Sequence, residues 1–227
     1  DIIRLFGKDK NIQNLVVVNP DNPSGNYIPK ADIKKLIQWA KDQNITLVVD
    51  ESFVDFADEE DSSIIDQQLL TANPHLFVMK SISKSYGVPG LRLGVLASGD
   101  TETIQKIKKD VAIWNINSFG EFYLQIAEKY KKDYAAALRQ IRQERKRFEE
   151  ELRKIPGLRV IPSQANFVMV ELENADAKAL TKKLLIKHNL LIKELTTKTH
   201  GKNYLRLAIR NTEDNDRLLE ALGQELK

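Results

Sequence analysis

The stretch that decides the fold is residues 12–50, "IQNLVVVNPDNPSGNYIPKADIKKLIQWAKDQNITLVVD". It opens with an apolar run rich in valine and continues into the turn-rich "NPDNPSG", which predicts a buried strand that ends in a loop. The following segment repeats apolar residues at helical spacing: Ile33, Leu36, Ile37 and Ala40. The run "ITLVVD" then predicts a second buried strand. Strand, helix and strand in this order imply a parallel pair.

The same alternation continues along the chain. "HLFVMK" at 75–80 and "LRLGVLA" at 91–97 read as strands on either side of a loop, and "DTETIQKIKKDVAI" at 100–113 reads as a helix. Continuously apolar strands that lie between helices are typical of an α/β fold built on a parallel sheet. We therefore expect an α/β part over residues 1–130.

Beyond residue 118 the sequence changes character. The segment 119–154 contains no proline and is rich in Ala, Leu, Glu, Lys and Arg, which predicts a long helix with a break near Lys131. Short strands follow in "LRVI", "NFVMVEL" and "NYLRLAI", with an amphipathic helix near 176–188 and a closing helix from "TEDND". We expect residues 131–227 to form an interdomain helix and a small α+β domain.

The composition excludes several classes of function. The 35 basic and 32 acidic residues leave a net charge of +3, which gives no field strong enough to indicate a nucleic acid or a membrane surface as partner. The apolar runs are far shorter than a bilayer span, and no signal region opens the chain, so we expect a cytoplasmic protein. With no cysteine, and three histidines far apart in the sequence, we expect no disulfide and no metal site.

Candidate site residues follow the predicted strands, because ligands gather at the carboxyl ends of a parallel sheet. Asn22 follows the first strand, Asp50 closes the second and Lys84 follows the third. A carboxylate at the end of an apolar strand is costly to bury without a partner, although a capping or turn role is an alternative for Asp50. In "SISKSYGVPGLR" Lys84 lies among small hydroxyls, with Arg92 eight positions on. This setting indicates a reactive amine beside a phosphate site.

Four motifs in order carry a resemblance to a known family: "NPDNPSG", "DESFVDF", "SISKSYGVPGLRLG" and "NYLRLAIRNTEDNDRLLEAL". They resemble the fold-type-I pyridoxal-phosphate enzymes (class I/II aminotransferases), and most closely histidinol-phosphate aminotransferase and threonine-phosphate decarboxylase. The resemblance implies a large cofactor-binding domain whose remainder is residues 1–130, followed by the small domain. It also implies pyridoxal 5′-phosphate as cofactor, a homodimer, and an amino acid and a 2-oxo acid as small-molecule partners.

The resemblance assigns roles around the cofactor ring. Lys84 would form the Schiff base with the cofactor aldehyde and, once freed, act as general base on the α-proton. Asp50 would keep the pyridine nitrogen protonated, which strengthens the ring as an electron sink. Asn22 would donate a hydrogen bond to the phenolate oxygen of the ring.

Further roles concern the phosphate and the substrate. By the same resemblance Ser81, Ser83 and Arg92 would hold the cofactor phosphate, the arginine through charge-assisted bonds. Arg206, in the middle of "YLRLA", would bind the substrate carboxylate with its planar fork. The alternative for Arg206 is an ordinary arginine on a strand face.

The sequence also departs from the family pattern. Phe53 stands where these aminotransferases usually have a tyrosine hydroxyl, and related decarboxylases also carry phenylalanine there. Only 18 residues precede Asn19, so the chain resembles roughly the C-terminal two-thirds of such an enzyme, and we expect it to bind the cofactor weakly or not at all.

Three functions remain open from the sequence. The first is a pyridoxal-phosphate-dependent aminotransferase that moves an amino group between an amino acid and a 2-oxo acid. The second is a decarboxylase of a phosphorylated or phosphonate amino acid, and the third is a non-catalytic aminotransferase-like sensing domain.

Overall fold

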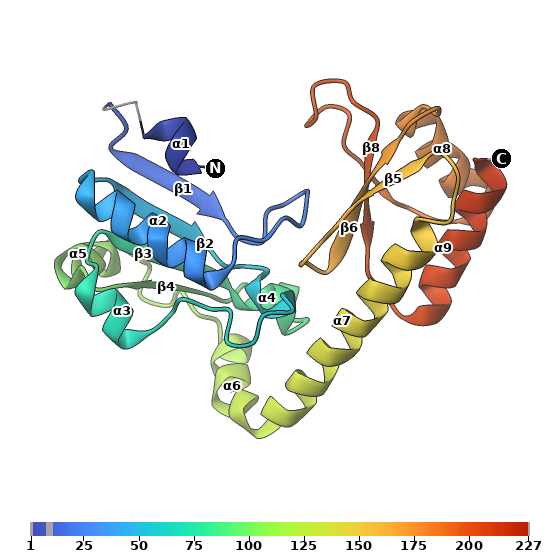
Figure 1. Cartoon of the computed structure of the whole chain (residues 1–227). Coiled ribbons are helices and arrows are strands. Elements are labelled where there is room, and N and C mark those ends of the chain that lie inside the picture. The colour runs from blue at the N-terminus through green and yellow to red at the C-terminus, as the bar shows by residue number, and fades with distance from the viewer. Residues whose placement is uncertain (1, 8–10, 227) are drawn as a thin grey trace. The chain divides into compact units, whose positions relative to one another are not determined.

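The computed structural model describes residues 2–7 and 11–226 (Figure 1). The chain divides into two compact units. The first unit comprises Asp1–Pro20 and Ile28–Ala135, and the second comprises Asp21–Tyr27 and Ala136–Lys227. The expected division between residues 130 and 131 stays a prediction.

The first unit is built on a four-stranded sheet in the order β1-β2-β3-β4. The strands are β1 (Asn14–Val18), β2 (Thr46–Asp50), β3 (Leu76–Ser81) and β4 (Gly94–Ser98). The strands β1, β2 and β3 run parallel, as the sequence predicted, whereas β4 pairs with β3 in the antiparallel direction. Because β1, β2 and β3 are parallel, their carboxyl ends lie at one edge of the sheet.

Helices complete the first unit: α1 (Ile2–Phe6), α2 (Lys30–Asp42), α3 (Gln67–Ala72), α4 (Ile82–Ser85), α5 (Thr101–Asp110) and α6 (Ser118–Ala127). Short 3-10 helices lie at Val54–Phe56, Pro89–Leu91 and Glu128–Tyr130. The apolar stripe of α2 is buried, as its helical spacing predicted, and packs with the strand residues Leu47, Val49, Leu76 and Val78 in one core.

The longer stretch of the second unit begins within the long helix α7 (Lys131–Leu152), which starts where the sequence predicted a break. Its sheet has the order β5-β6-β8-β7, and every pair is antiparallel. The strands are β5 (Leu158–Ile161), β6 (Phe167–Leu172), β7 (Lys193–Glu194) and β8 (Tyr204–Ala208). The helices α8 (Ala177–His188) and α9 (Thr212–Glu225) complete the unit.

The core of the second unit joins helices to one face of this sheet. Alternate strand residues such as Val168, Val170, Leu205 and Leu207 are buried. They pack with side chains of the helices, among them Phe148, Leu152, Leu180, Leu184, Leu218 and Leu222. The predicted α/β part with a parallel sheet and the small α+β part are therefore both present. Within the two described stretches of the chain, no helix combines the length and the apolar character that a membrane crossing requires.

Candidate functional site

Asp50 ends β2 at the edge of the parallel sheet, in register with Val18 on one side and Met79 on the other. Its Oδ1 accepts a hydrogen bond from the Ser52 backbone N–H at 2.8 Å and another from the Ser52 hydroxyl at 2.5 Å. The same hydroxyl oxygen accepts from the Ser81 N–H at 3.2 Å, so Ser52 links two of the predicted site residues. Oδ2 of Asp50 accepts no hydrogen bond from the described residues, which leaves it available to a ligand.

Lys84 lies on α4, which begins directly after β3. The side chain is exposed, and its Nζ lies 5.0 Å from the centre of the Phe53 ring. It makes no hydrogen bond or ion pair with any residue that the structure describes. An amine in this setting is accessible to an incoming aldehyde.

The predicted phosphate residues have different surroundings. Ser83 is 4% exposed, and its hydroxyl donates to the Leu93 carbonyl at 3.4 Å. The Ser81 hydroxyl has no hydrogen-bond partner within the described part of the chain. Arg92 is exposed in a left-handed backbone conformation with φ of 57°, and its guanidinium contacts the Pro89 carbonyl at 3.4 Å. Ser81 and Arg92 therefore have polar groups to offer to a ligand, while the Ser83 hydroxyl is engaged.

A hollow of about 490 Å³ brings some of these groups together in the first unit. Ser81 and Arg92 both line it, as do Ser52 and Lys80. A hydroxyl and a guanidinium that face one hollow suit an anionic group such as a phosphate. The guanidinium could supply charge and the hydroxyl a further hydrogen bond.

A second cluster, around Asp55 in the first unit, was not predicted from the sequence. Oδ1 of Asp55 forms an ion pair with Lys80 Nζ at 2.6 Å, and Oδ2 accepts from the Ser85 hydroxyl at 2.7 Å and the Tyr134 hydroxyl at 2.8 Å. The Tyr134 ring stacks on Tyr86, with centroids 4.0 Å apart. Burial, together with the negative charge of Asp55, raises the pKa of Tyr134, so its hydroxyl stays a donor.

Glu51, the neighbour of Asp50, is 2% exposed and fixes the loop that follows β2. Its carboxylate accepts from the Ser63 hydroxyl at 2.6 Å and from the Ile64 N–H at 2.7 Å. Burial raises the pKa of Glu51 above its ordinary 4.5, and the two hydrogen bonds oppose that shift.

Asn22 and Arg206 belong to the second unit and contact each other. Arg206 Nη1 donates to the Asn22 side-chain oxygen at 2.6 Å, and the guanidinium carbon lies 5.0 Å from the centre of the Phe167 ring. Because its oxygen is engaged by Arg206, the Asn22 amide has its NH₂ group left to donate. The predicted donor role of Asn22 and the predicted carboxylate role of Arg206 stay predictions.

The loop that carries Asn22 is held in the second unit by a close backbone approach. The Gly25 carbonyl accepts from the Gln164 N–H at 2.8 Å. Gly25 has φ of +73°, and a Cβ on it would lie 2.0 Å from the Ser163 hydroxyl oxygen, so only glycine fits here.

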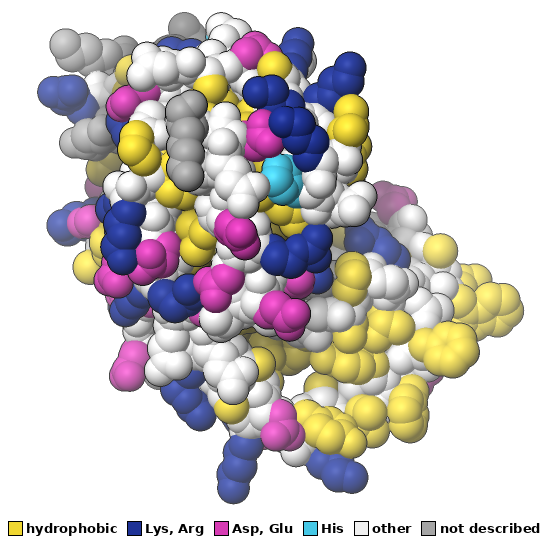
Figure 2. Space-filling model, turned by 90° about the vertical axis from the view of Figure 1, so that its right-hand side faces the viewer, with side chains coloured by type: hydrophobic (Ala, Val, Ile, Leu, Met, Phe, Trp, Pro, Cys, Tyr) yellow, Lys and Arg dark blue, Asp and Glu magenta, His cyan; other side chains and the backbone are white. Residues whose placement is uncertain are grey.

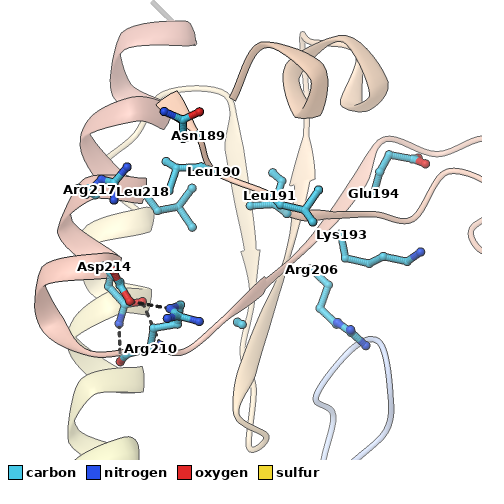
Figure 3. Close-up of a pocket in the computed structure, with 13 residues that line it drawn as sticks. Asn189, Leu190, Leu191, Lys193, Glu194, Arg206, Arg210, Asp214, Arg217 and Leu218 are labelled. Atoms are coloured by element: carbon cyan, nitrogen blue, oxygen red, sulfur yellow. Dashed lines mark hydrogen bonds and ion pairs between the residues drawn. The ribbon is translucent and has the colours of Figure 1, made fainter. Parts of the chain in front are cut away.

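Arg206 also lines a hollow of about 790 Å³ in the second unit (Figure 3). In Figure 3 the side chains of Arg206 and Lys193 extend to one side, away from Arg210 and Asp214. Lys193 on β7 is the direct register partner of Arg206 on β8. Arg210 is engaged with Asp214 at 2.6 Å, and Arg217 donates to the His188 carbonyl at 3.0 Å.

The donor set of the first unit fits pyridoxal phosphate. An unpaired amine suits an aldehyde, an available carboxylate oxygen suits a protonated ring nitrogen, and Ser81 with Arg92 suits a phosphate. Over residues 2–7 and 11–226 there is no group of three or more His, Cys, Asp or Glu side chains that could hold a metal ion.

Comparison with known proteins identifies the family. The family described as aminotransferase class I and II matches residues 2–222. The CMP-5′-(3-aminopropyl)phosphonate synthase of Streptomyces rubellomurinus is 36% identical over 222 residues, which is 96% of this chain and 35% of that protein. The threonine-phosphate decarboxylase of Salmonella typhimurium is 31% identical over 216 residues, which is 93% of this chain and 57% of that protein.

A solved structure agrees with these relatives. The histidinol-phosphate aminotransferase from Clostridium acetobutylicum matches with a TM-score of 0.89 at 30% identity, over 99% of this chain and 67% of that one. The chain thus spans between about a third and three fifths of the length of the two curated relatives. Proteins of this family are fold-type-I enzymes that depend on pyridoxal phosphate, and both the expected fold class and the expected cofactor are confirmed. The chain belongs to the class I and II aminotransferase family.

Proposed function

We propose that this chain is part of a pyridoxal-phosphate-dependent decarboxylase that acts on an amino acid bearing a phosphate or phosphonate group. The observation that carries the proposal is the position of the Lys84 amine, 5.0 Å from the centre of the Phe53 ring. Aminotransferases of this kind usually have a tyrosine hydroxyl where Phe53 stands. A substrate carboxylate that lies near an apolar ring loses hydration, and this favours the loss of neutral carbon dioxide. The names of the phosphonate synthase and of the threonine-phosphate decarboxylase support the same substrate class.

The predicted site residues would hold the cofactor. Lys84 would hold its aldehyde carbon covalently, Asp50 Oδ2 would face its ring nitrogen, and Ser81 and Arg92 would bind its phosphate. Ser83, whose hydroxyl already donates to Leu93, would contribute through its place in α4. Asn22 would donate its free NH₂ group to the ring oxygen. When bound, pyridoxal phosphate supplies an electron-withdrawing ring that takes up the electron pair released at the substrate α-carbon.

The chain's own residues would then carry the proton chemistry. Asp50, as an anion, would keep the proton on the ring nitrogen. When the bond between the α-carbon and the carboxylate breaks and carbon dioxide leaves, the Lys84 ammonium would deliver a proton to the α-carbon in its place. Arg206 would bind an anionic group of the substrate through its planar fork.

The second candidate is an aminotransferase of the histidinol-phosphate type, which would exchange an amino group between an amino acid and a 2-oxo acid. The unpaired amine of Lys84 favours it as well, because transamination requires one base that removes the α-proton and returns it elsewhere. The solved histidinol-phosphate aminotransferase supports it at a similar level of identity. Both candidates share the cofactor residues and differ in the bond that breaks.

Two measurements test the proposal. Borohydride reduction of the chain with pyridoxal phosphate, followed by peptide mapping, should place the label on Lys84, and Lys84→Arg should remove it. A label on another lysine would overturn the assignment. Product analysis with O-phosphorylated and phosphonate amino acids should detect carbon dioxide, whereas formation of a 2-oxo acid would indicate the aminotransferase. Ligand binding with neither product would point to a sensing domain.

We further propose that the chain pairs with a second copy of itself. The stretch around α6 exposes large apolar side chains, with Ile113 94%, Trp114 91%, Phe119 79% and Phe122 60% exposed. Figure 2 shows that hydrophobic side chains gather in one region of the face it presents. Exposed apolar clusters of this kind mark interaction surfaces. Sedimentation analysis should give a dimer, and Trp114→Glu should shift it toward the monomer, whereas a wild-type monomer would contradict the proposal.

A further inference from the structure

Two lysines lie four positions apart at the carboxyl end of β3, and their surroundings differ. Lys80 forms an ion pair with Asp55 at 2.6 Å, and the two side chains are only 17% and 16% exposed. Lys84 is exposed and makes no ion pair or hydrogen bond with the described residues. Lys80, and not Lys84, is among the residues that line the hollow with Ser81 and Arg92. A second amine therefore lies beside the groups suited to the cofactor phosphate.

Asp55 also fixes the residues that follow Lys84. Its Oδ2 accepts from the hydroxyls of Ser85 and Tyr134, at 2.7 Å and 2.8 Å. Tyr134 in turn stacks on Tyr86, with ring planes only 8° apart. The end of α4 is thus attached to Asp55 both directly, through Ser85, and indirectly, through the two stacked rings.

We propose that Asp55 is a positioning residue that selects Lys84 over Lys80 as the reactive amine. One carboxylate oxygen holds Lys80 as an ammonium in an ion pair, and the other fixes the helix turn from which Lys84 extends. The inference deepens the proposed function, because it rests on Lys84 being the residue that carries the cofactor.

The chemistry of amines supports this selection. An amine that is largely buried and held in an ion pair with a carboxylate is less accessible to an aldehyde than an exposed amine. Salt in the solvent screens a mostly buried ion pair less than one on the surface, so the Asp55–Lys80 pair persists where exposed pairs do not. The raised pKa of Tyr134 keeps its hydroxyl protonated, so that it continues to donate to Asp55.

The test measures the reactivity of the two amines in the 227-residue chain without cofactor. A limiting amount of formaldehyde with cyanoborohydride methylates neutral amines, and peptide mass spectrometry gives the ratio of labelling at Lys80 to labelling at Lys84. In the wild-type chain Lys80 should be labelled several-fold less than Lys84. Asp55→Asn, which keeps the shape and removes the charge, should raise the ratio roughly three- to tenfold.

Two further variants control the experiment. Asp32→Asn removes the partner of Lys35, an exposed lysine paired at 2.7 Å, and should leave the Lys80 to Lys84 ratio unchanged. Asp55→Glu restores the carboxylate and should bring the ratio back toward the wild-type value. A residue that only stabilised the fold would not change this ratio in a chain that circular dichroism shows to be folded.

Two outcomes would overturn the inference. One is a folded Asp55→Asn chain with the wild-type ratio, and the other is a wild-type chain in which Lys80 reacts as fast as Lys84. If Asp55→Asn does not fold, the wild-type ratio decides alone. Borohydride mapping with pyridoxal phosphate tests the proposed function separately, so a label away from Lys84 would remove that function even where Asp55 controls the two amines as expected.

Discussion

Replacing Asp50 by asparagine should separate the stability of the first unit from its affinity for pyridoxal phosphate. In the structure Oδ1 of Asp50 accepts both hydrogen bonds from Ser52, and Oδ2 accepts none from the described residues. An asparagine can keep its carbonyl oxygen toward Ser52 and place its NH₂ group where Oδ2 was. The free energy of unfolding should therefore fall by about 1 kcal/mol or less, since the two bonds remain but lose their charge.

The affinity for the cofactor should change more. An NH₂ group facing a protonated ring nitrogen sets donor against donor, so the charge-assisted bond is lost, at a cost of about 1.5–3 kcal/mol. That corresponds to a dissociation constant raised about 10- to 150-fold. An absorbance titration with pyridoxal phosphate into the millimolar range would measure it, and urea unfolding followed by far-UV circular dichroism would measure stability.

A matched variant sharpens the comparison. Ser52→Ala removes the hydroxyl that donates to Asp50 and accepts from the Ser81 N–H, so it should cost about 1–2 kcal/mol of stability with a smaller effect on affinity. If Asp50→Asn bound the cofactor as tightly as the wild-type chain, the carboxylate would be only a strand cap, and the role given to it would be wrong.

The other predictions concern one substrate residue and two titrating groups. Arg206→Lys keeps the charge but loses the fork that also contacts Asn22, so substrate affinity should fall by roughly 1–3 kcal/mol with cofactor affinity unchanged, whereas Arg159→Lys on β5 should alter neither. Because burial raises the pKa of Glu51, the protonated carboxyl stabilises the folded chain. This contribution to the free energy of unfolding is complete below pH 4.5 and is lost as the pH rises through the raised pKa of the folded state. Urea unfolding from about pH 4 to about pH 8 should show this slope in the wild-type chain and not in Glu51→Gln. The pKa of Tyr134 is raised above 10.0 as well, so its contribution is lost as the pH rises beyond that value, and alkaline unfolding of Tyr134→Phe should show a shallower slope. Slopes equal to those of the wild-type chain would contradict both pH predictions.

The sequence predicted the strands and long helices because their apolar residues follow a regular period. Helix α2 buries the stripe that its spacing indicated, and α7 begins near the expected break. Helix α3, by contrast, has six residues of which only Leu70 is buried, too few for a periodic signal. The sequence also could not predict that β4 pairs in the antiparallel direction, since an apolar run of five residues has the same pattern in a parallel and in an antiparallel pair.

The candidate site was predictable where a motif lies within one loop and not where contacts join distant segments. Asp50 ends β2 and Lys84 follows β3, and the topology of a parallel sheet was enough to predict them as neighbours, whereas Ser81 was named only through the family resemblance. Asp55 was missed because its partners Lys80 and Tyr134 are 25 and 79 residues away. The contact of Asn22 with Arg206 spans 184 residues, and no local pattern marks it.

The membership of loop 21–27 in the second unit has a consequence for attempts to take the protein apart. A gene cut after residue 135 would yield a C-terminal piece without Gly25, whose carbonyl pairs with Gln164, and without Asn22, whose oxygen engages Arg206. That piece would have a gap beside Ser163 and an arginine without its natural neighbour. The smaller unit is therefore not a module that recombination could transplant in a single stretch, and any swap between relatives must carry the seven-residue loop along with it.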